Sequence, residues 1–167
     1  DATSHAVVGQ CAEARREAAA AIQLSRDSST LGSAARALAW CGAGAEAAAI
    51  SSELSRRFPQ ATLTTHVLLP VIAAATAIRQ PERALDLLEP VRRFDRAPVA
   101  EFWPMYLRGQ ALLKLKRYAD AAEEFRSIVD HRGELADAPL YPLAHLSLGR
   151  ALALGGDRPA AREAYVA

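Results

Sequence analysis

Cysteine is scarce in this chain, since Cys11 and Cys41 are the two cysteines among 167 residues. Their separation gives neither a CxxC pair nor the ligand spacing of a zinc site, so no structural metal is expected. We expect both side chains to be buried, reduced thiols, because free cysteine behaves as a small apolar residue. A disulfide between them is the alternative, and it would require an oxidising compartment.

The chain also lacks an excess of charge, long apolar runs and abundant aromatic residues. Lysine and arginine number 20 against 19 acidic residues, and the net charge of +1 argues against direct nucleic-acid binding. No run of 18 apolar residues is free of charges and no signal peptide is visible, so we predict no membrane insertion by this region. A cytoplasmic location is slightly favoured, while an extracytoplasmic one stays open for a parent protein with a membrane span. Asp1, in place of an initiator methionine, indicates a fragment of a longer protein.

Alanine is what the chain has in abundance, at 38 of its positions. Alanine has the highest intrinsic helix propensity, whereas the β-branched and aromatic residues that favour strands are sparse. Composition therefore predicts an all-α fold whose small side chains let the helices pack closely.

An internal repeat organises the chain. The segment RYADAAEEFRSIVDH, 117–131, places its apolar residues at steps of three and four, which is the spacing of one helix face. The pattern returns forty residues later, where Gly149 matches Gly109 and Tyr165 matches Phe125. Weaker copies lie upstream. Equivalent alanines thus recur 33, 37, 37 and 40 residues apart, at Ala14, Ala47, Ala84, Ala121 and Ala161.

These units predict about nine helices in a single domain spanning 1–167. Residues 132–139 are interpreted as a longer loop before the final pair. The prediction is a lone helix at 5–24, followed by four antiparallel pairs at about 28–58, 62–93, 100–131 and 140–167.

The third of these pairs resembles the tetratricopeptide repeat (TPR), whose glycine, alanine and aromatic positions are matched by Gly109, Ala121 and Phe125. The resemblance implies a right-handed α-solenoid of antiparallel helix pairs. In such a unit the small residue lets two helices approach closely, and the aromatic residue wedges between neighbouring repeats. The chain departs from the motif at Arg108, where leucine is preferred.

Other phrases carry a narrower resemblance. LSRRFP, ALDLLEP and EFRSIVDHRG are similar to the C-terminal TPR region of bacterial multidomain signalling proteins. Those parents resemble serine/threonine protein kinases or winged-helix regulators. The resemblance implies a regulatory or sensing region, because no kinase motif occurs in these residues. In the first two pairs, Ala35 and Ile72 replace the glycine of the motif.

No catalytic or cofactor site is predicted. The segment GAGAEA, 42–47, has the spacing of a dinucleotide-binding loop, but a helical pattern precedes it, so we interpret it as an inter-helix turn. No nucleophile has a base and an orienting group nearby, and the four histidines lack metal-ligand spacing. We therefore expect no enzyme activity and no cofactor. Glu123 and Glu124 are interpreted as a solvated helix face, and His145 is expected to be partly buried.

The family resemblance implies a concave groove lined by the first helix of each pair. Aromatic and arginine side chains, which are enriched at binding hot spots, recur there at helical spacing. We expect Tyr106 to be exposed in this groove, whereas Trp103 fits exposure and burial about equally. The predicted partner-binding residues are Arg36, Trp40, His66, Leu69, Trp103, Tyr106, Gln110, Lys114 and Arg150, with Leu143 and Leu146 beside Arg150.

The predicted function is a protein–protein interaction scaffold that captures a peptide or partner protein in this groove. Arg36, Lys114 and Arg150 would make the groove basic, which suits an acidic or C-terminal peptide. The family's carboxylate clamp of lysine, asparagine and arginine is not reproduced, so binding of chaperone tails is not expected. The alternative is a sensory or oligomerisation module of a parent kinase or transcription regulator, which self-associates through apolar faces of its end helices.

Overall fold

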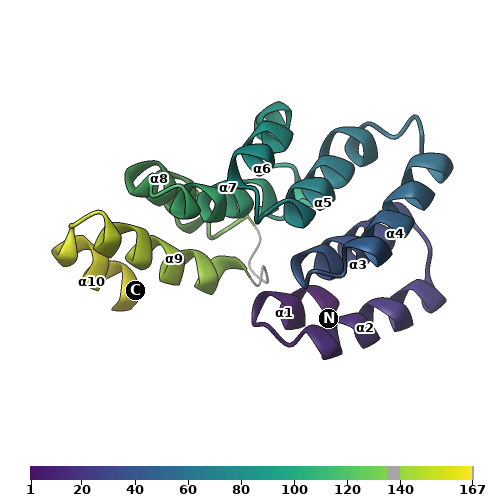
Figure 1. Ribbon diagram of the computed structural model, residues 1–167, viewed down its shortest axis with the longest axis horizontal. Helices are drawn as coiled ribbons and strands as arrows, with labels where there is room; N and C mark the ends of the chain where they lie inside the picture. Colours follow the sequence, from purple (N-terminus) through teal and green to yellow (C-terminus); the bar gives the residue numbers. More distant parts are fainter. Residues whose placement is uncertain (135–139, 167) are drawn as a thin grey trace.

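The computed structural model describes residues 1–134 and 140–166, and it is all-helical over them, with no strand. Figure 1 shows the helices following one another around an arch. The α-helices are α1 (Ala2–Val7), α2 (Cys11–Leu24), α3 (Ser28–Trp40), α4 (Gly44–Arg57), α5 (Leu69–Thr76), α6 (Pro81–Leu88), α7 (Trp103–Lys114), α8 (Tyr118–Val129), α9 (Leu140–Leu154) and α10 (Arg158–Val166). Shorter segments are the π-helix η1 (Thr64–Leu68) and the 3-10 helices η2 (Glu89–Phe94) and η3 (Pro98–Ala100). Within this described part, no helix is long and apolar enough to cross a membrane.

The predicted lone helix at 5–24 is wrong, because Gly9 divides it into α1 and α2. Gly9 has a φ of +82°, a left-handed conformation that glycine adopts without steric cost. Since α1 packs against both α2 and α3, it is the first helix of a further pair, and the described residues form ten α-helices where about nine were expected. Of the predicted loop at 132–139, residues 135–139 lie outside the described part, as does Ala167.

Four of the turns that join paired helices have the same backbone. Each contains one left-handed residue, and the amide of the next residue donates to the carbonyl five positions earlier, as Ala43 does to Leu38 at 2.9 Å. This arrangement is the Schellman motif, which satisfies the free carbonyls at a helix C-terminus. The left-handed residues are Gly9, Gly42, Lys116 and Gly156.

The five alanines that define the repeat occupy one structural position. Each is the fourth residue of its helix, and each is buried, at the start of α2, α4, α6, α8 and α10. The spacing of 33 to 40 residues read from the sequence therefore reflects a real structural repeat. An alanine fits here because the position faces the preceding helix of the same pair, where a larger side chain would push the two apart.

The pairs stack on one another. Every α-helix packs against the next, and the odd-numbered helices also contact each other in order, α1 with α3, α3 with α5, α5 with α7 and α7 with α9. One hydrophobic cluster extends from Ala18 in α2 to Ala164 in α10. The odd-numbered helices are therefore in contact one after another, and each packs against the even-numbered helix that follows it.

The pair of α5 and α6 is one residue out of register with the others. α3 and α7 end seven residues before the buried alanine of the following helix, whereas α5 ends at Thr76, eight residues before Ala84. A shift of one residue turns a helix by about 100°. The alignment of Ile72 with Gly109 is therefore wrong by one position, and Val71 is its structural equivalent.

A disulfide joins the first pair to α3. Cys11 begins α2 and Cys41 directly follows α3, and their Cα atoms lie 5.5 Å apart across the bond. The expectation of two reduced thiols is therefore wrong, because the hairpin of α1 and α2 brings these positions together. Around the bond, the small cluster of Ala6, Ala14 and Ala37 buries little apolar surface.

Candidate partner-binding site

The aromatic residues of the predicted groove pack against one another. Ring centroids of Trp40 and Trp103 lie 5.8 Å apart, and Tyr106 lies 5.8 Å from Trp40 and 5.8 Å from Phe125. Trp103 is buried and Tyr106 is only 4% exposed, so the expectation that Tyr106 lies open in a groove is wrong. Burial raises the pKa of the Tyr106 hydroxyl, although its hydrogen bonds with Ser147 and Gln110 lower it in part. Trp40 stays half-buried at the edge of this cluster.

Arg36 is buried as well, and its charge is not free to make the groove basic. Its guanidinium lies 4.8 Å from the centroid of the Trp103 ring and forms an ion pair with Glu101. Burial lowers the pKa of Arg36, and Glu101 opposes that shift. Glu101 and Phe102 adopt left-handed conformations, with φ of 48° and 63°, immediately before α7. Such backbone is uncommon for these residue types, so the sequence gives no signal that Glu101 meets Arg36.

The changed register of α5 separates His66 and Leu69 from the other predicted residues. His66 is exposed, and its ring stacks on Phe94 with a centroid distance of 6.2 Å. Leu69 instead faces a hollow between α4 and α6. His145 is half-buried, as expected, and its Nε2 lies 3.0 Å from the hydroxyl of Tyr141. Across residues 1–134 and 140–166, no three histidine, cysteine or acidic side chains converge as a group that could hold a metal ion.

Gln110, Lys114 and Arg150 lie where α7 and α9 meet. The side-chain amide of Gln110 donates to the hydroxyl of Ser147 at 3.1 Å, which joins the two helices. Both helices pack against α8, and Tyr118 at its start is close to Gly155 at the end of α9. α7 and α9 therefore run in the same direction and end side by side.

Lys114 and Arg150 are exposed at these ends, together with two leucines of α9. Leu146 is 57% exposed and Leu154 is 50% exposed. Leu146, Arg150 and Leu154 are spaced four residues apart along α9, so their side chains lie on one side of the helix. Leu154 was not among the residues predicted from the sequence. It could have been found there, because it aligns with the predicted residue Lys114 when the last two pairs are superimposed. We call the surface of Lys114, Leu146, Arg150 and Leu154 the α7–α9 face.

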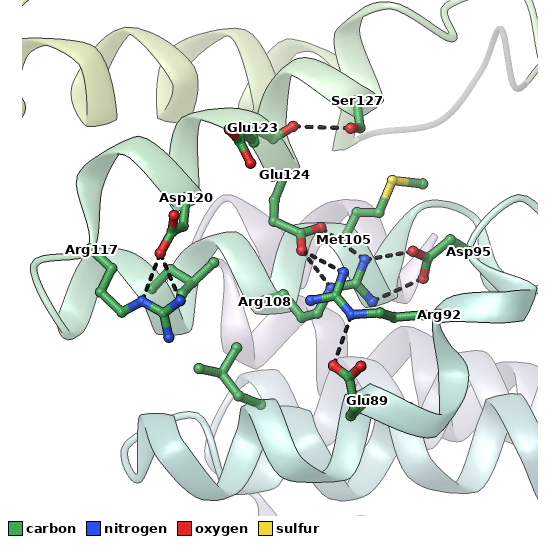
Figure 2. A pocket seen from close by; sticks show the side chains of 12 residues that line it. Glu89, Arg92, Asp95, Met105, Arg108, Arg117, Asp120, Glu123, Glu124 and Ser127 are labelled. Carbon is green, nitrogen blue, oxygen red and sulfur yellow. Dashed lines mark hydrogen bonds and ion pairs between the residues drawn. The ribbon is translucent and has the colours of Figure 1, made fainter.

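A second region, between α6 and α8, is strongly charged (Figure 2). This hollow of about 520 Å³ lies between α6 and α8, and Arg108 forms part of its floor. Arg108 is 1% exposed and donates to Asp95 at 2.6 and 2.9 Å and to Glu124 at 2.8 Å from two nitrogens. Arg92 donates to the same Glu124 at 3.2 Å. Glu124 therefore belongs to a buried ion-pair network. The expectation that it lies on a solvated helix face is wrong.

This network explains the departure of Arg108 from the leucine of the motif. Burial by itself would lower the pKa of Arg108, but its hydrogen bonds to Glu124 and Asp95 raise the pKa above the ordinary value. The guanidinium thus connects α7 to α8 and to the segment after η2. Because its carboxylate partners come from the chain itself, the α6–α8 hollow has a structural explanation without a ligand. No protein-family model, curated protein or solved structure matches this chain.

Proposed function

We propose that this chain is an α-solenoid of TPR-like helix pairs that binds a partner protein and has no catalytic role. The repeated Schellman turns, the buried alanine at the start of each second helix and the contacts among odd-numbered helices support the solenoid. A stack of this kind presents a long surface built from many helices, which suits protein recognition. The inner part of that surface is closed by Arg36, Trp103 and Tyr106, which are buried.

The observation that carries the binding function is the exposed α7–α9 face. It combines two leucines with the cations of Lys114 and Arg150, and among the described residues neither cation forms an ion pair. Leucine side chains supply apolar contact area, while unpaired cations supply charge complementarity and orientation. The ligand proposed is a helical or extended segment of a partner protein with leucine-like and acidic side chains.

A selection from a random peptide library on the immobilised chain tests this function. Peptides that bind through the α7–α9 face should be rich in acidic and apolar residues, and the double variant Lys114→Glu, Arg150→Glu should bind them at least about tenfold more weakly. Arg56→Glu, Arg79→Glu is the matched control, because both arginines are exposed and lie outside this face. Failure to enrich any peptide, or equal binding by the double variant, would contradict the proposal.

Self-association is the second candidate function, and the exposed apolar residues of α10 favour it. Val166 is 79% exposed and Tyr165 is 50% exposed. Light scattering over a range of concentrations measures this directly. A mass that rises with concentration in the wild type, and stays at the monomer value in Val166→Asp, supports oligomerisation. A constant monomer mass in both rejects it.

The disulfide supports an extracytoplasmic location, because such bonds persist in oxidising compartments. Alkylation of Cys11 and Cys41 in the native host, before and after reduction, tests this location. Labelling that requires reductant agrees with it, and labelling without reductant contradicts it.

A further inference from the structure

A second hollow lies between α4 and α6, with α5 as its floor, and nothing in the described chain fills it. Its volume is about 520 Å³, within the range of ligand-binding clefts. Apolar and small residues make up most of its lining, among them Ala48, Leu69, Ala73 and Leu87. The hydroxyls of Ser51 and Ser52, which also line it, donate to backbone carbonyls of α4 and leave a largely apolar surface. We call it the α4–α6 hollow.

Arg83 is the one charged residue among those that line the α4–α6 hollow. It is exposed, and no ion pair involves it in residues 1–134 and 140–166. No carboxylate reaches this hollow from any of its three helices. The α6–α8 hollow has the same volume but is crossed by Arg108, Arg92 and Glu124, so the two differ in charge balance and not in size.

One pair earlier, the positions equivalent to Ala48 and Arg83 hold an ion pair. Across α2 and α4, Arg15 directly follows the buried Ala14, Glu46 directly precedes the buried Ala47, and the two side chains form an ion pair at 2.7 Å. One pair later, the residue after Ala47 is Ala48, and the residue before the next buried alanine is Arg83. Arg83 thus occupies the position of one ion-pair partner, and a methyl group occupies the position of the other.

We propose that the α4–α6 hollow binds an apolar segment of a partner protein, with an aspartate or glutamate of that segment pairing with Arg83 above Ala48. The carboxylate takes the position that Arg15 fills one pair earlier, and Arg83 stands at the position of Glu46, so the two charges are exchanged. The apolar side chains of the segment lie on Leu69, Ala73 and Leu87. This site is distinct from the α7–α9 face, and it does not depend on that face being functional.

The test uses two synthetic helical peptides of leucine, alanine and serine, acetylated and amidated, with one central glutamate or one central glutamine. Each is titrated into isotope-labelled protein, and amide shifts are followed by NMR. The glutamate peptide should shift amides of α4, α5 and α6 with a dissociation constant of about 1 mM or tighter. The glutamine peptide should bind two- to fivefold more weakly, because an exposed ion pair contributes about that factor.

Four variants assign the binding to Arg83 and the hollow. Arg83→Gln removes the cation and should abolish the preference for glutamate. Ala48→Glu supplies the carboxylate within the chain. It should therefore abolish the preference for the glutamate peptide and weaken the binding of both peptides. Ala49→Glu adds the same charge to α4 at an exposed position outside the hollow and should leave binding unchanged. Ala73→Leu fills the floor of the hollow. It should weaken the binding of both peptides and leave the ratio of their dissociation constants unchanged. Thermal melts confirm that each variant is folded.

Two results would overturn the proposal. One is the absence of α4–α6 shifts with either peptide at several times the expected dissociation constant, about 5 mM. The other is a preference for glutamate that survives in both Ala48→Glu and Arg83→Gln. Shifts confined to α9 would also reject this hollow, while supporting the α7–α9 face.

Discussion

The ring of Phe125 lies directly against Gly109, at the place where any side chain of residue 109 would begin. A Cβ atom at Gly109 would be 2.6 Å from Cε1 and Cζ of Phe125, far inside van der Waals contact. Forty residues further on, Gly149 and Tyr165 repeat this relationship, with 2.5 Å to Cε1 of the ring. The last two helix pairs therefore depend on a contact between a glycine and an aromatic ring.

Gly109→Ala should destabilise the protein, although alanine is the better helix former. Helix propensity favours alanine by about 1 kcal/mol, but overpacking a buried site costs about 1–3 kcal/mol. Because Phe125 is fully buried, its ring has little room to move. We expect the free energy of unfolding, measured with urea, to fall by up to about 2 kcal/mol.

Gly44→Ala is the matched control for that substitution. A Cβ atom at Gly44 meets only Cγ2 of Thr76, at the ordinary contact distance of 3.5 Å, so stability should hold or rise by up to about 1 kcal/mol. Adding Phe125→Leu to Gly109→Ala should recover part of the loss in a double-mutant cycle. Equal stability changes for Gly109→Ala and Gly44→Ala would contradict the packing argument.

Replacing Arg108 with the leucine of the motif should destabilise the chain strongly. Arg108→Leu leaves the largely buried Asp95 without its partner and Glu124 with Arg92 alone, and breaking a buried ion pair in this way costs about 3–5 kcal/mol. Arg117→Leu removes an exposed pair with Asp120 and should cost less than about 1 kcal/mol. Urea unfolding of both variants measures the difference. If the two variants are equally stable, the network has no structural role.

Asp27 should make stability depend on pH in the acid range. Its carboxylate caps α3, and the hydroxyl of Ser25 and the backbone amide of Thr30 lower its pKa from 3.8 to about 2. A carboxylate with a lowered pKa stabilises the fold above its unfolded pKa, and this contribution is lost as pH falls from about 4 to about 2.

Asp27→Asn keeps an N-cap side chain without a titratable group. The wild type should therefore lose its Tm advantage over this variant between about pH 4 and pH 2, and both should behave alike at lower pH. Calorimetry at a series of pH values gives the comparison. A Tm difference that does not change over this range would show that Asp27 does not have the lowered pKa.

Reduction of the disulfide should loosen the first helix pair more than the rest. Closing a loop with a sequence separation of 30 stabilises a fold by about 3–4 kcal/mol, and α1 and α2 bury little besides alanine. With reductant, hydrogen exchange should accelerate first in α1 and α2, while α7 to α9 keep their protection. Unchanged exchange and an unchanged Tm after reduction would contradict this role of Cys11 and Cys41.

The sequence predicted the repeat well because its signal is local and steric. A buried alanine opening each second helix, and a glycine facing an aromatic ring in the last two pairs, are pairings within single hairpins. The boundary at Gly9 was missed because α1 has six residues and shows too little periodicity.

The burial of Arg36 and Tyr106 was not predicted, because it depends on contacts between distant pairs. Arg36 in α3 meets Glu101 and Trp103 near α7, and a left-handed backbone at residues 101–102 makes this possible. Nothing in the local pattern encodes that meeting. The local pattern also does not encode the rotation of α5 relative to the other first helices. This rotation follows from one extra residue between the end of α5 and Ala84.

NMR mapping of a library-selected peptide tests the central proposal most directly. Amide signals around Lys114, Leu146, Arg150 and Leu154 should shift on titration, while those around the buried Arg36 and Trp103 should not. Shifts centred on α3 and the start of α7, with none on α9, would contradict it.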